Sequence, residues 1–126
     1  MIWYLKMEKK MYKNITMTIY QKNKILSIIK VTNTGEILVT KFEKSIFHPF
    51  DKPKSFQKEL ESFLKTRIFD ENRPDKKYIL STLNLINYDP LLIAQKTHGI
   101  LFQDEIWLHF NNESFSWREA YAILQS

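Results

Sequence analysis

The sequence predicts a single α+β domain over residues 1–126, with a small antiparallel sheet and about four short helices. In residues 1–46, apolar and polar side chains alternate with the period of two that half-buried strands show. From residue 55 onward, apolar side chains recur at helical spacing instead. A chain of 126 residues is also long enough for one core of its own. Residues 1–46 are therefore expected to be strand-rich, and residues 55–126 helix-rich with one or two strands.

Three successive strands are expected to form an antiparallel meander at the start of the chain. Residues 14–20 alternate apolar and polar side chains, and residues 25–31 are rich in β-branched side chains. The third strand, 37–42, follows a turn in which Gly35 is free to adopt a positive φ. The next segment, 47–53, contains two prolines, which lack an N–H donor and fix φ. It is expected to be a connector with exposed aromatic side chains.

Two helices are expected next. The first begins near Ser55 and ends before the Asp70–Pro74 cluster, because one apolar stripe runs along it: Phe56, Leu60, Phe63, Leu64 and Ile68. The second is expected from about Asp75 to Ile86. Its predicted buried side chains are Ile79, Leu83 and Ile86, with Leu80 beside them.

The remaining elements are predicted from their end signals. Asp89 is expected to cap a third helix that Gly99 stops, with Pro90 at its first position. A strand is expected over residues 106–110, where apolar positions alternate. Ser116 fits a capping box that opens a last helix through Leu124, with Glu119 three residues later.

Composition limits the classes of function. The chain has no cysteine, so neither disulfides nor a thiolate metal site is expected, and the cytoplasm is the expected compartment. No signal peptide or membrane span is predicted, and no membrane partner. The net charge of +5 is unevenly distributed: residues 1–54 hold eleven lysines and four acidic residues, whereas residues 55–126 hold eight basic and ten acidic residues. The lysine-rich part predicts either a solvated face or a surface for nucleic acid or an acidic partner.

Residues that could carry catalysis do not form a known motif. The two glycines, Gly35 and Gly99, are too far apart for a phosphate-binding loop, and no hydrolase, zinc-protease or kinase catalytic motif is present. His48, His98 and His109 are isolated in the sequence, so no metal site is predicted. The acidic pair Asp104-Glu105 is more typical of a turn than of a catalytic dyad. The chain is therefore expected not to be an enzyme and to need no cofactor.

The order of features from Leu60 to Glu119 resembles the segment that precedes the kinase core in HipA-like proteins. In that segment, a helix ending L-x-x-[WF]-L-x-x-R is followed six residues on by a second arginine. An amphipathic helix, a glycine-containing turn, a D-x-x-W strand and a helix starting S/T-W-[KRE]-[DE] come next. The matching residues are Leu60, Phe63, Leu64, Arg67, Arg73, Ile79, Leu80, Gly99, Asp104, Trp107, Ser116, Trp117, Arg118 and Glu119. Phe69 and Asp70 depart from the pattern, because a proline usually precedes the second arginine.

The resemblance implies a regulatory subdomain that is detached from its kinase. HipA-like proteins are serine/threonine kinases of toxin–antitoxin modules, and in three-gene versions a separate small protein, HipS, neutralises the kinase. The expected function is therefore that of an antitoxin-like, non-catalytic module that binds and restrains a HipA/HipT-type kinase in trans. A helix-turn-helix antitoxin is a further expected member of the same complex.

Partner contact is predicted for Arg67, Arg73, Phe47 and Phe50. Guanidinium groups suit carboxylates and phosphoserine, although an intramolecular salt bridge or a helix-end contact is the alternative for both arginines. Fold-specifying roles as turn, core and cap are expected for Gly99, Asp104, Trp107, Ser116 and Trp117. Two other functions stay open: a nucleic-acid-binding accessory protein that uses the lysine-rich part, and a phage-borne inhibitor of a host enzyme.

Overall fold

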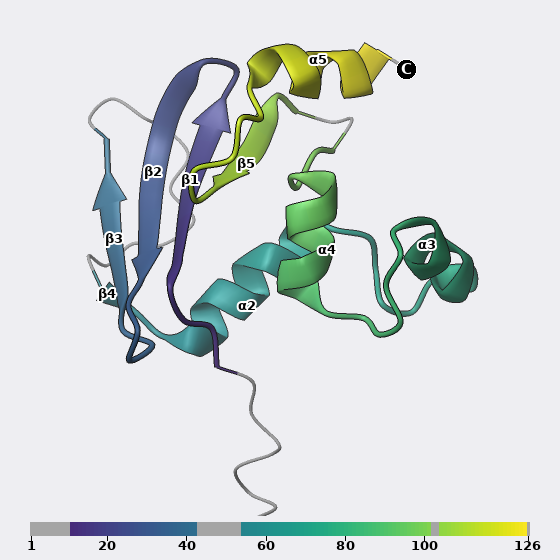
Figure 1. Cartoon of the computed structure of the whole chain (residues 1–126), viewed down its shortest axis with the longest axis horizontal. Helices are drawn as coiled ribbons and strands as arrows, with labels where there is room; N and C mark the ends of the chain where they lie inside the picture. The colour runs from purple at the N-terminus through teal and green to yellow at the C-terminus, as the bar shows by residue number, and fades with distance from the viewer. Residues whose placement is uncertain (1–10, 43–53, 102–103, 126) are drawn as a thin grey trace, which may run out of the picture.

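A computed structural model describes residues 11–42, 54–101 and 104–125. Its centre is a five-stranded sheet in the order β4-β3-β2-β1-β5, with every neighbouring pair antiparallel (Figure 1). The strands are β1 (Ile15–Gln21), β2 (Lys24–Val31), β3 (Ile37–Lys41), β4 (Lys54–Ser55) and β5 (Ile106–Phe110). The predicted meander of β1, β2 and β3 is confirmed. The C-terminal strand joins the meander beside β1 and unites the two halves of the chain in one sheet.

The strand register places the predicted alternate side chains in one core. Met17 pairs with Ile29 on one side and with Phe110 on the other, and all three are buried. The pairing of β1 with β2 shifts between Ile19 and Tyr20, which leaves Leu26 as an extra, buried residue. Such a bulge lets two successive residues change their facing without breaking the strand.

The helices are α2 (Gln57–Thr66), α3 (Lys76–Thr82), α4 (Pro90–Thr97) and α5 (Trp117–Gln125). α2 and α4 contact each other and cross beside the sheet (Figure 1). The buried side chains of α2 and Ala94 of α4 join the strand residues in one hydrophobic cluster, so the fold is a single compact α+β domain. No helix in the described part of the chain is both long and apolar enough to cross a bilayer.

The side chain of Gln57 fastens the residues before β1 to this core. Its Oε1 accepts a hydrogen bond from Tyr12 N at 2.6 Å, and its Nε2 donates to Tyr12 O at 3.0 Å and to Gly35 O at 2.6 Å. One carboxamide therefore satisfies both backbone groups of Tyr12, as a neighbouring strand would. The Tyr12 side chain is buried in the same cluster.

Two predicted helix boundaries differ from the structure. Ser55 lies in β4, and α2 begins after Phe56, which makes no side-chain cap. α3 was expected to reach Ile86 but ends at Thr82, because Asn84 adopts φ +60° and Leu85 N bonds to Leu80 O. Asparagine tolerates this left-handed conformation, which ends helices in the same way as glycine.

The predicted apolar stripe of α3 is correspondingly wrong. Leu80 is buried, but Ile79 and Leu83 are only partly buried and Ile86 is 92% exposed. α3 stands at the end of the molecule away from the sheet (Figure 1). Residues 70–87 thus form an excursion from the body, here called the helical arm. The residues on either side of the arm contact each other: the Tyr88 hydroxyl donates to Phe69 O at 2.6 Å, and the two rings meet edge to face.

Candidate functional site

Arg67, the C-cap residue of α2, points into the protein. Its guanidinium donates to Gly99 O from Nε at 3.0 Å, to both carboxylate oxygens of Asp104 at 2.8 and 3.0 Å, and to Ile106 O at 3.0 Å. The residue is only 5% exposed. The intramolecular salt bridge is therefore the alternative that the structure bears out. Four of its five N–H groups donate inside the fold, and the predicted partner contact by Arg67 stays a prediction.

Asp104 completes this pair at the start of β5. Besides Arg67, its Oδ1 accepts from Ile106 N at 3.1 Å, which makes Asp104 the turn residue that the sequence predicts. Burial works to raise the pKa of Asp104, but the hydrogen bonds from Arg67 and Ile106 N and the charge of Arg67 outweigh it, so this pKa lies below its ordinary value of 3.8. The carboxylate is therefore ionised at neutral pH.

The outer edge of β5 is saturated by neighbouring groups. Ile106 N bonds to Asp104, Leu108 N donates to His98 O at 2.8 Å, and Phe110 N donates to Glu113 Oε2 at 2.5 Å. An edge strand with free N–H groups invites another strand to pair with it. Because these three donors are occupied, this edge is closed to strand addition by a partner.

Gly99 lies where α4 meets β5. It has φ +60°, and a Cβ atom there would lie 2.7 Å from Leu108 Cδ1. The preceding residue, His98, is also left-handed and is the C-cap of α4. Gly99 therefore specifies the fold as predicted, both by its conformation and by the close approach of Leu108.

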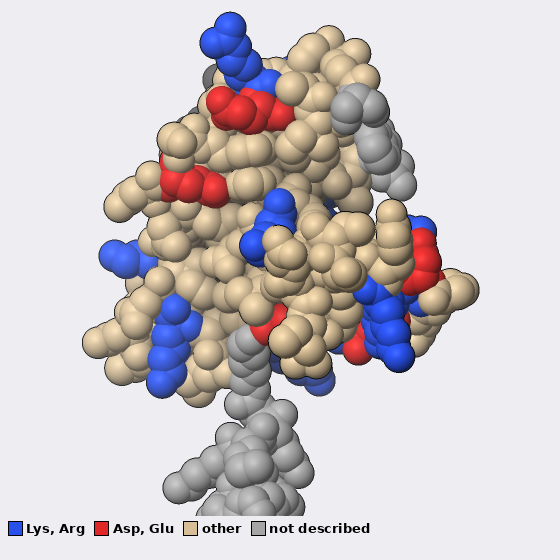
Figure 2. Space-filling view, turned by 45° about the vertical axis from the view of Figure 1, so that its right-hand side comes forward, with Lys and Arg blue, Asp and Glu red and all other residues tan. Residues whose placement is uncertain are grey.

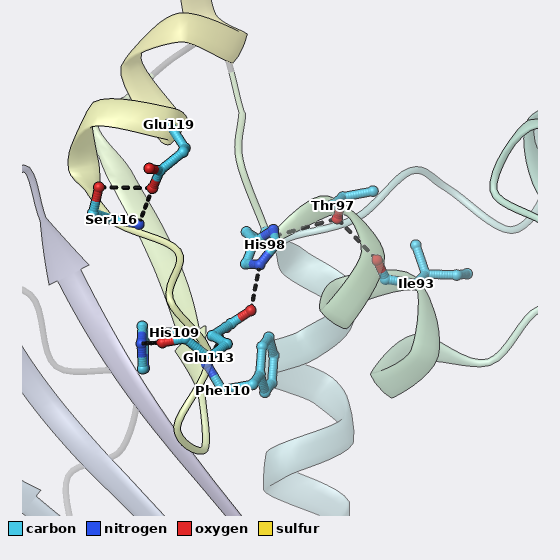
Figure 3. Close-up of polar contacts among 9 residues, drawn as sticks. Ile93, Thr97, His98, His109, Phe110, Glu113, Ser116 and Glu119 are labelled. Carbon is cyan, nitrogen blue, oxygen red and sulfur yellow. Dashed lines mark hydrogen bonds and ion pairs between the residues drawn. The ribbon is translucent and has the colours of Figure 1, made fainter.

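Two histidines that are isolated in the sequence converge on Glu113 (Figure 3). His98 Nε2 and Glu113 Oε1 lie 2.8 Å apart, and His109 Nε2 lies 2.7 Å from Glu113 O. The His98 ring also stacks on Phe115 with 3.6 Å between centroids. These contacts tie the end of α4 to the segment between β5 and α5.

The histidine cluster does not form a metal site. No group of three His, Cys, Asp or Glu side chains is placed to hold a metal ion within residues 11–42, 54–101 and 104–125. His98 is mostly buried, and its Nε2 is committed to Glu113. His48 lies outside the described residues. Sequence reasoning missed Glu113 and Phe115, because neither belongs to a periodic element or a motif.

Trp107 is a core residue, as predicted, but not of the main cluster. Its indole Nε1 donates to Lys22 O at 2.8 Å, which ties β5 to the β1–β2 turn. Its ring stacks on Tyr20 at 4.5 Å and meets Phe115 edge to face. Trp107 is buried, with Tyr20 and Phe115 packed against its ring.

Ser116 and Trp117 begin α5 as the sequence predicts. Glu119 accepts hydrogen bonds from Ser116 N and from Ser116 Oγ, and these bonds lower the pKa of Glu119. Trp117 is half-buried and lines a groove of about 580 Å³. This feature, here called the α5 groove, has as its lining Gln21, Asp104, Glu105, Trp117, Tyr121, Leu124 and Gln125.

Arg73 lies on the helical arm and pairs locally. Its guanidinium bonds to both carboxylate oxygens of Asp75 at 2.9 Å, and both side chains are about half exposed. Such surface pairs contribute little to stability, so Arg73 can exchange Asp75 for another partner. The partner contact of Arg73 therefore stays a prediction. Phe47 and Phe50, the other two predicted contact residues, lie outside the described residues.

The candidate functional surfaces are therefore the helical arm and the α5 groove. The histidine cluster and the Arg67–Asp104 pair instead stabilise the part of the domain that lies between these two surfaces. Comparison with family models, with curated proteins and with solved structures finds no match for the chain. The functional argument accordingly rests on these two surfaces and on the residue pattern.

Proposed function

We propose that the chain is a non-catalytic protein-binding module that restrains a HipA-type serine/threonine kinase in trans, in the cytoplasm. The sequence resemblance supplies the class of partner. Most of the residues that carry it, including Gly99, Asp104 and Trp107, have structural partners inside the domain. Such residues can specify a docking module without supplying chemistry.

The observation that carries the proposal is the exposure of large apolar side chains on the helical arm. Ile86 is 92% exposed and Tyr78 is 72% exposed, on a segment that stands away from the core (Figure 1). Beside Ile86, a shallow hollow of about 460 Å³ is lined by Lys77, Leu80, Ser81, Asn84, Leu85 and Ile86. An exposed apolar side chain beside such a hollow on a small domain is typical of an interaction site.

Restraint of the kinase would follow from docking alone. A domain bound against the N-lobe of a kinase can hinder the closure or the activation-loop rearrangement that catalysis requires. Arg73 would contribute by exchanging its exposed bond to Asp75 for a carboxylate or phosphoserine of the kinase. This mechanism requires no catalytic group in the present chain.

Co-expression with a HipA-type kinase encoded beside this gene tests the proposal. The expected result is a complex that elutes as one peak on gel filtration and growth of cells that the kinase alone would arrest. Separate elution together with undiminished toxicity would overturn it.

The charge reversal Arg73→Glu is expected to weaken the complex roughly tenfold, because a hydrogen bond between charged groups is lost and a repulsion replaces it. Lys65→Glu is the matched control, since Lys65 is an exposed basic residue of α2, away from the arm. Calorimetric titration of the kinase with each variant gives the comparison. Equal affinities of the two variants would exclude Arg73 as a contact.

A nucleic-acid-binding accessory role is the second candidate, and the lysines of residues 1–54 favour it. On the face in Figure 2, however, lysine and arginine side chains are set apart, with acidic side chains near some of them. This candidate predicts binding to duplex DNA or RNA that weakens steeply with salt. Absence of any mobility shift at low salt would eliminate it.

A further inference from the structure

The α5 groove combines an apolar wall with a polar one. Trp117, Tyr121 and Leu124 of α5 recur at positions i, i+4 and i+7, which places them on one face of the helix. The rings of Trp117 and Tyr121 lie 5.7 Å apart. Gln21, Asp104 and Glu105 line the groove with them, from the end of β1 and from the segment before β5.

Both charged side chains among the described residues that line this groove are acidic. Asp104 is 34% exposed, and the pKa of Asp104 lies below its ordinary value, so its surface is a carboxylate. Its charge is balanced by the buried Arg67, which bonds to both carboxylate oxygens, so Glu105 is the carboxylate that remains open to a visiting cation. Glu105 pairs with Lys22 at 3.5 Å, but both side chains are about half exposed, and such a surface pair contributes little to stability, so Glu105 can exchange Lys22 for another cation.

Aromatic faces beside carboxylates are suited to binding a cationic group. A guanidinium or ammonium group is attracted to the face of tryptophan or tyrosine, and it forms charge-assisted hydrogen bonds with carboxylates. Leu124 adds apolar area for an aliphatic neighbour of that cation. Phosphate-bearing ligands, including nucleic acid and anionic membranes, find no cation among the described residues that line the groove, so this lining does not suit them.

From this complementarity we propose that the α5 groove docks a basic, partly apolar segment of a partner protein. An arginine or lysine side chain of that segment lies against Trp117 and Tyr121 and bonds to Glu105. The inference rests on the proposed protein-binding function and names the surface and the partner chemistry. It assigns α5, rather than the helical arm alone, to partner recognition.

The first test uses the full ¹⁵N-labelled chain and the peptide acetyl-Leu-Arg-Ile-Arg-Leu-amide. Saturable shifts are expected in the Trp117 indole signal and in the amides of residues 104–105 and 117–125. The peptide with glutamate in place of arginine is expected to leave these signals unmoved. Equal shifts with both peptides, or shifts confined to the helical arm, would overturn the proposal. Chemical-shift changes of the same signals on addition of a DNA oligonucleotide or of anionic vesicles would also contradict the proposal.

Two variants sharpen this test. Glu105→Lys and Tyr121→Ser change exposed side chains and are each expected to weaken peptide binding at least about fivefold. Glu71→Lys on the arm is the matched control for the charge reversal, since it changes the net charge equally, and Tyr78→Ser is the control for the tyrosine. Circular dichroism of each variant confirms folding. If peptide binding weakens equally in the control variants, the effect is not specific to the α5 groove, and the proposed docking site is wrong.

The kinase complex separates this inference from the function on which it rests. If the kinase binds the wild-type chain and Glu105→Lys equally well, the groove proposal is wrong and the protein-binding function stands. If the peptide occupies the groove but no kinase complex forms, the proposed kinase partner is wrong and the groove stands. Loss of kinase binding in Glu105→Lys, but not in Glu36→Lys, which changes the net charge equally at an exposed residue outside both surfaces, supports both.

Discussion

The role of Arg67 follows from the groups that surround its side chain. Its four hydrogen bonds join the end of α2 to Gly99, Asp104 and Ile106. Only the planar fork of arginine can donate in these directions at once, so lysine would leave acceptors without a donor. Removing one partner of a buried ion pair typically costs about 3–5 kcal/mol, because the other charge stays unpaired. The observed contacts of Arg67 are therefore those of a residue that stabilises the fold.

Gly99→Ala is expected to destabilise the fold by roughly 2–5 kcal/mol, from left-handed strain and from overpacking against Leu108. Urea unfolding monitored by circular dichroism measures this difference. Gly35→Ala is the comparison, because it shares the positive φ but its new Cβ would meet mainly the flexible end of Met11. If the two substitutions cost the same, the close approach of Leu108 has no energetic weight.

At the scale of elements, capping residues set the helix ends. Asp89 accepts hydrogen bonds from Leu91 N and Leu92 N, and Pro90 occupies the first position of α4. Glu119 bonds back to Ser116 at the start of α5. Asn84 ends α3 by a left-handed turn. Each device satisfies backbone groups that a helix end leaves without partners.

Asp89→Ala is expected to lower the free energy of unfolding by about 1 kcal/mol, because two N–H groups of α4 lose their acceptor. Asp89→Asn keeps an acceptor oxygen and should cost much less. Thermal unfolding of the three proteins at one pH gives the ranking. A stability of Asp89→Asn as low as that of Asp89→Ala would show that charge, not capping, is the main contribution.

At the scale of the whole molecule, one ion pair joins a helix to the sheet. The Arg67–Asp104 salt bridge connects α2 with β5, and β5 in turn pairs with β1. The His98–Glu113 contact adds a second tie, between α4 and the segment before α5. The domain that bears the helical arm and the α5 groove is therefore stabilised by these polar contacts as well as by its hydrophobic core.

The Arg67–Asp104 pair predicts a loss of stability in acid. Because the folded-state pKa of Asp104 is below that of the unfolded chain, this stabilisation is complete above the unfolded value, near about 4, and is lost as pH falls through the folded value. The stability difference between the wild type and Asp104→Asn should therefore shrink below about pH 4. Urea unfolding at pH 7 and at successively lower pH measures it. Glu71→Gln is the control, and a wild-type advantage that stays constant with pH would contradict the assignment.

Local pattern was sufficient for the parts of the fold that are locally determined. The alternation of Ile15, Met17 and Ile19 predicts β1, and the sequence Asp89-Pro90 predicts the start of α4, because period and capping depend on neighbours in the chain. The same reasoning placed Gly99, Asp104 and Ser116 as turn and cap residues. It failed at Ile86, because a helical stripe reveals an apolar face but not whether anything packs against it.

The sequence by itself determined the α+β class and the order of the helices and of the four longer strands, but not the short strand β4. Only the tertiary structure decided that β5 pairs with β1, that Arg67 turns inward and that His98 and His109 meet at Glu113. It also placed the acidic pair at 104–105 beside the aromatic face of α5. The physical reason is that, apart from the His109–Glu113 contact, which spans four residues, these contacts join residues distant along the chain, and long-range packing leaves no period or spacing in the sequence.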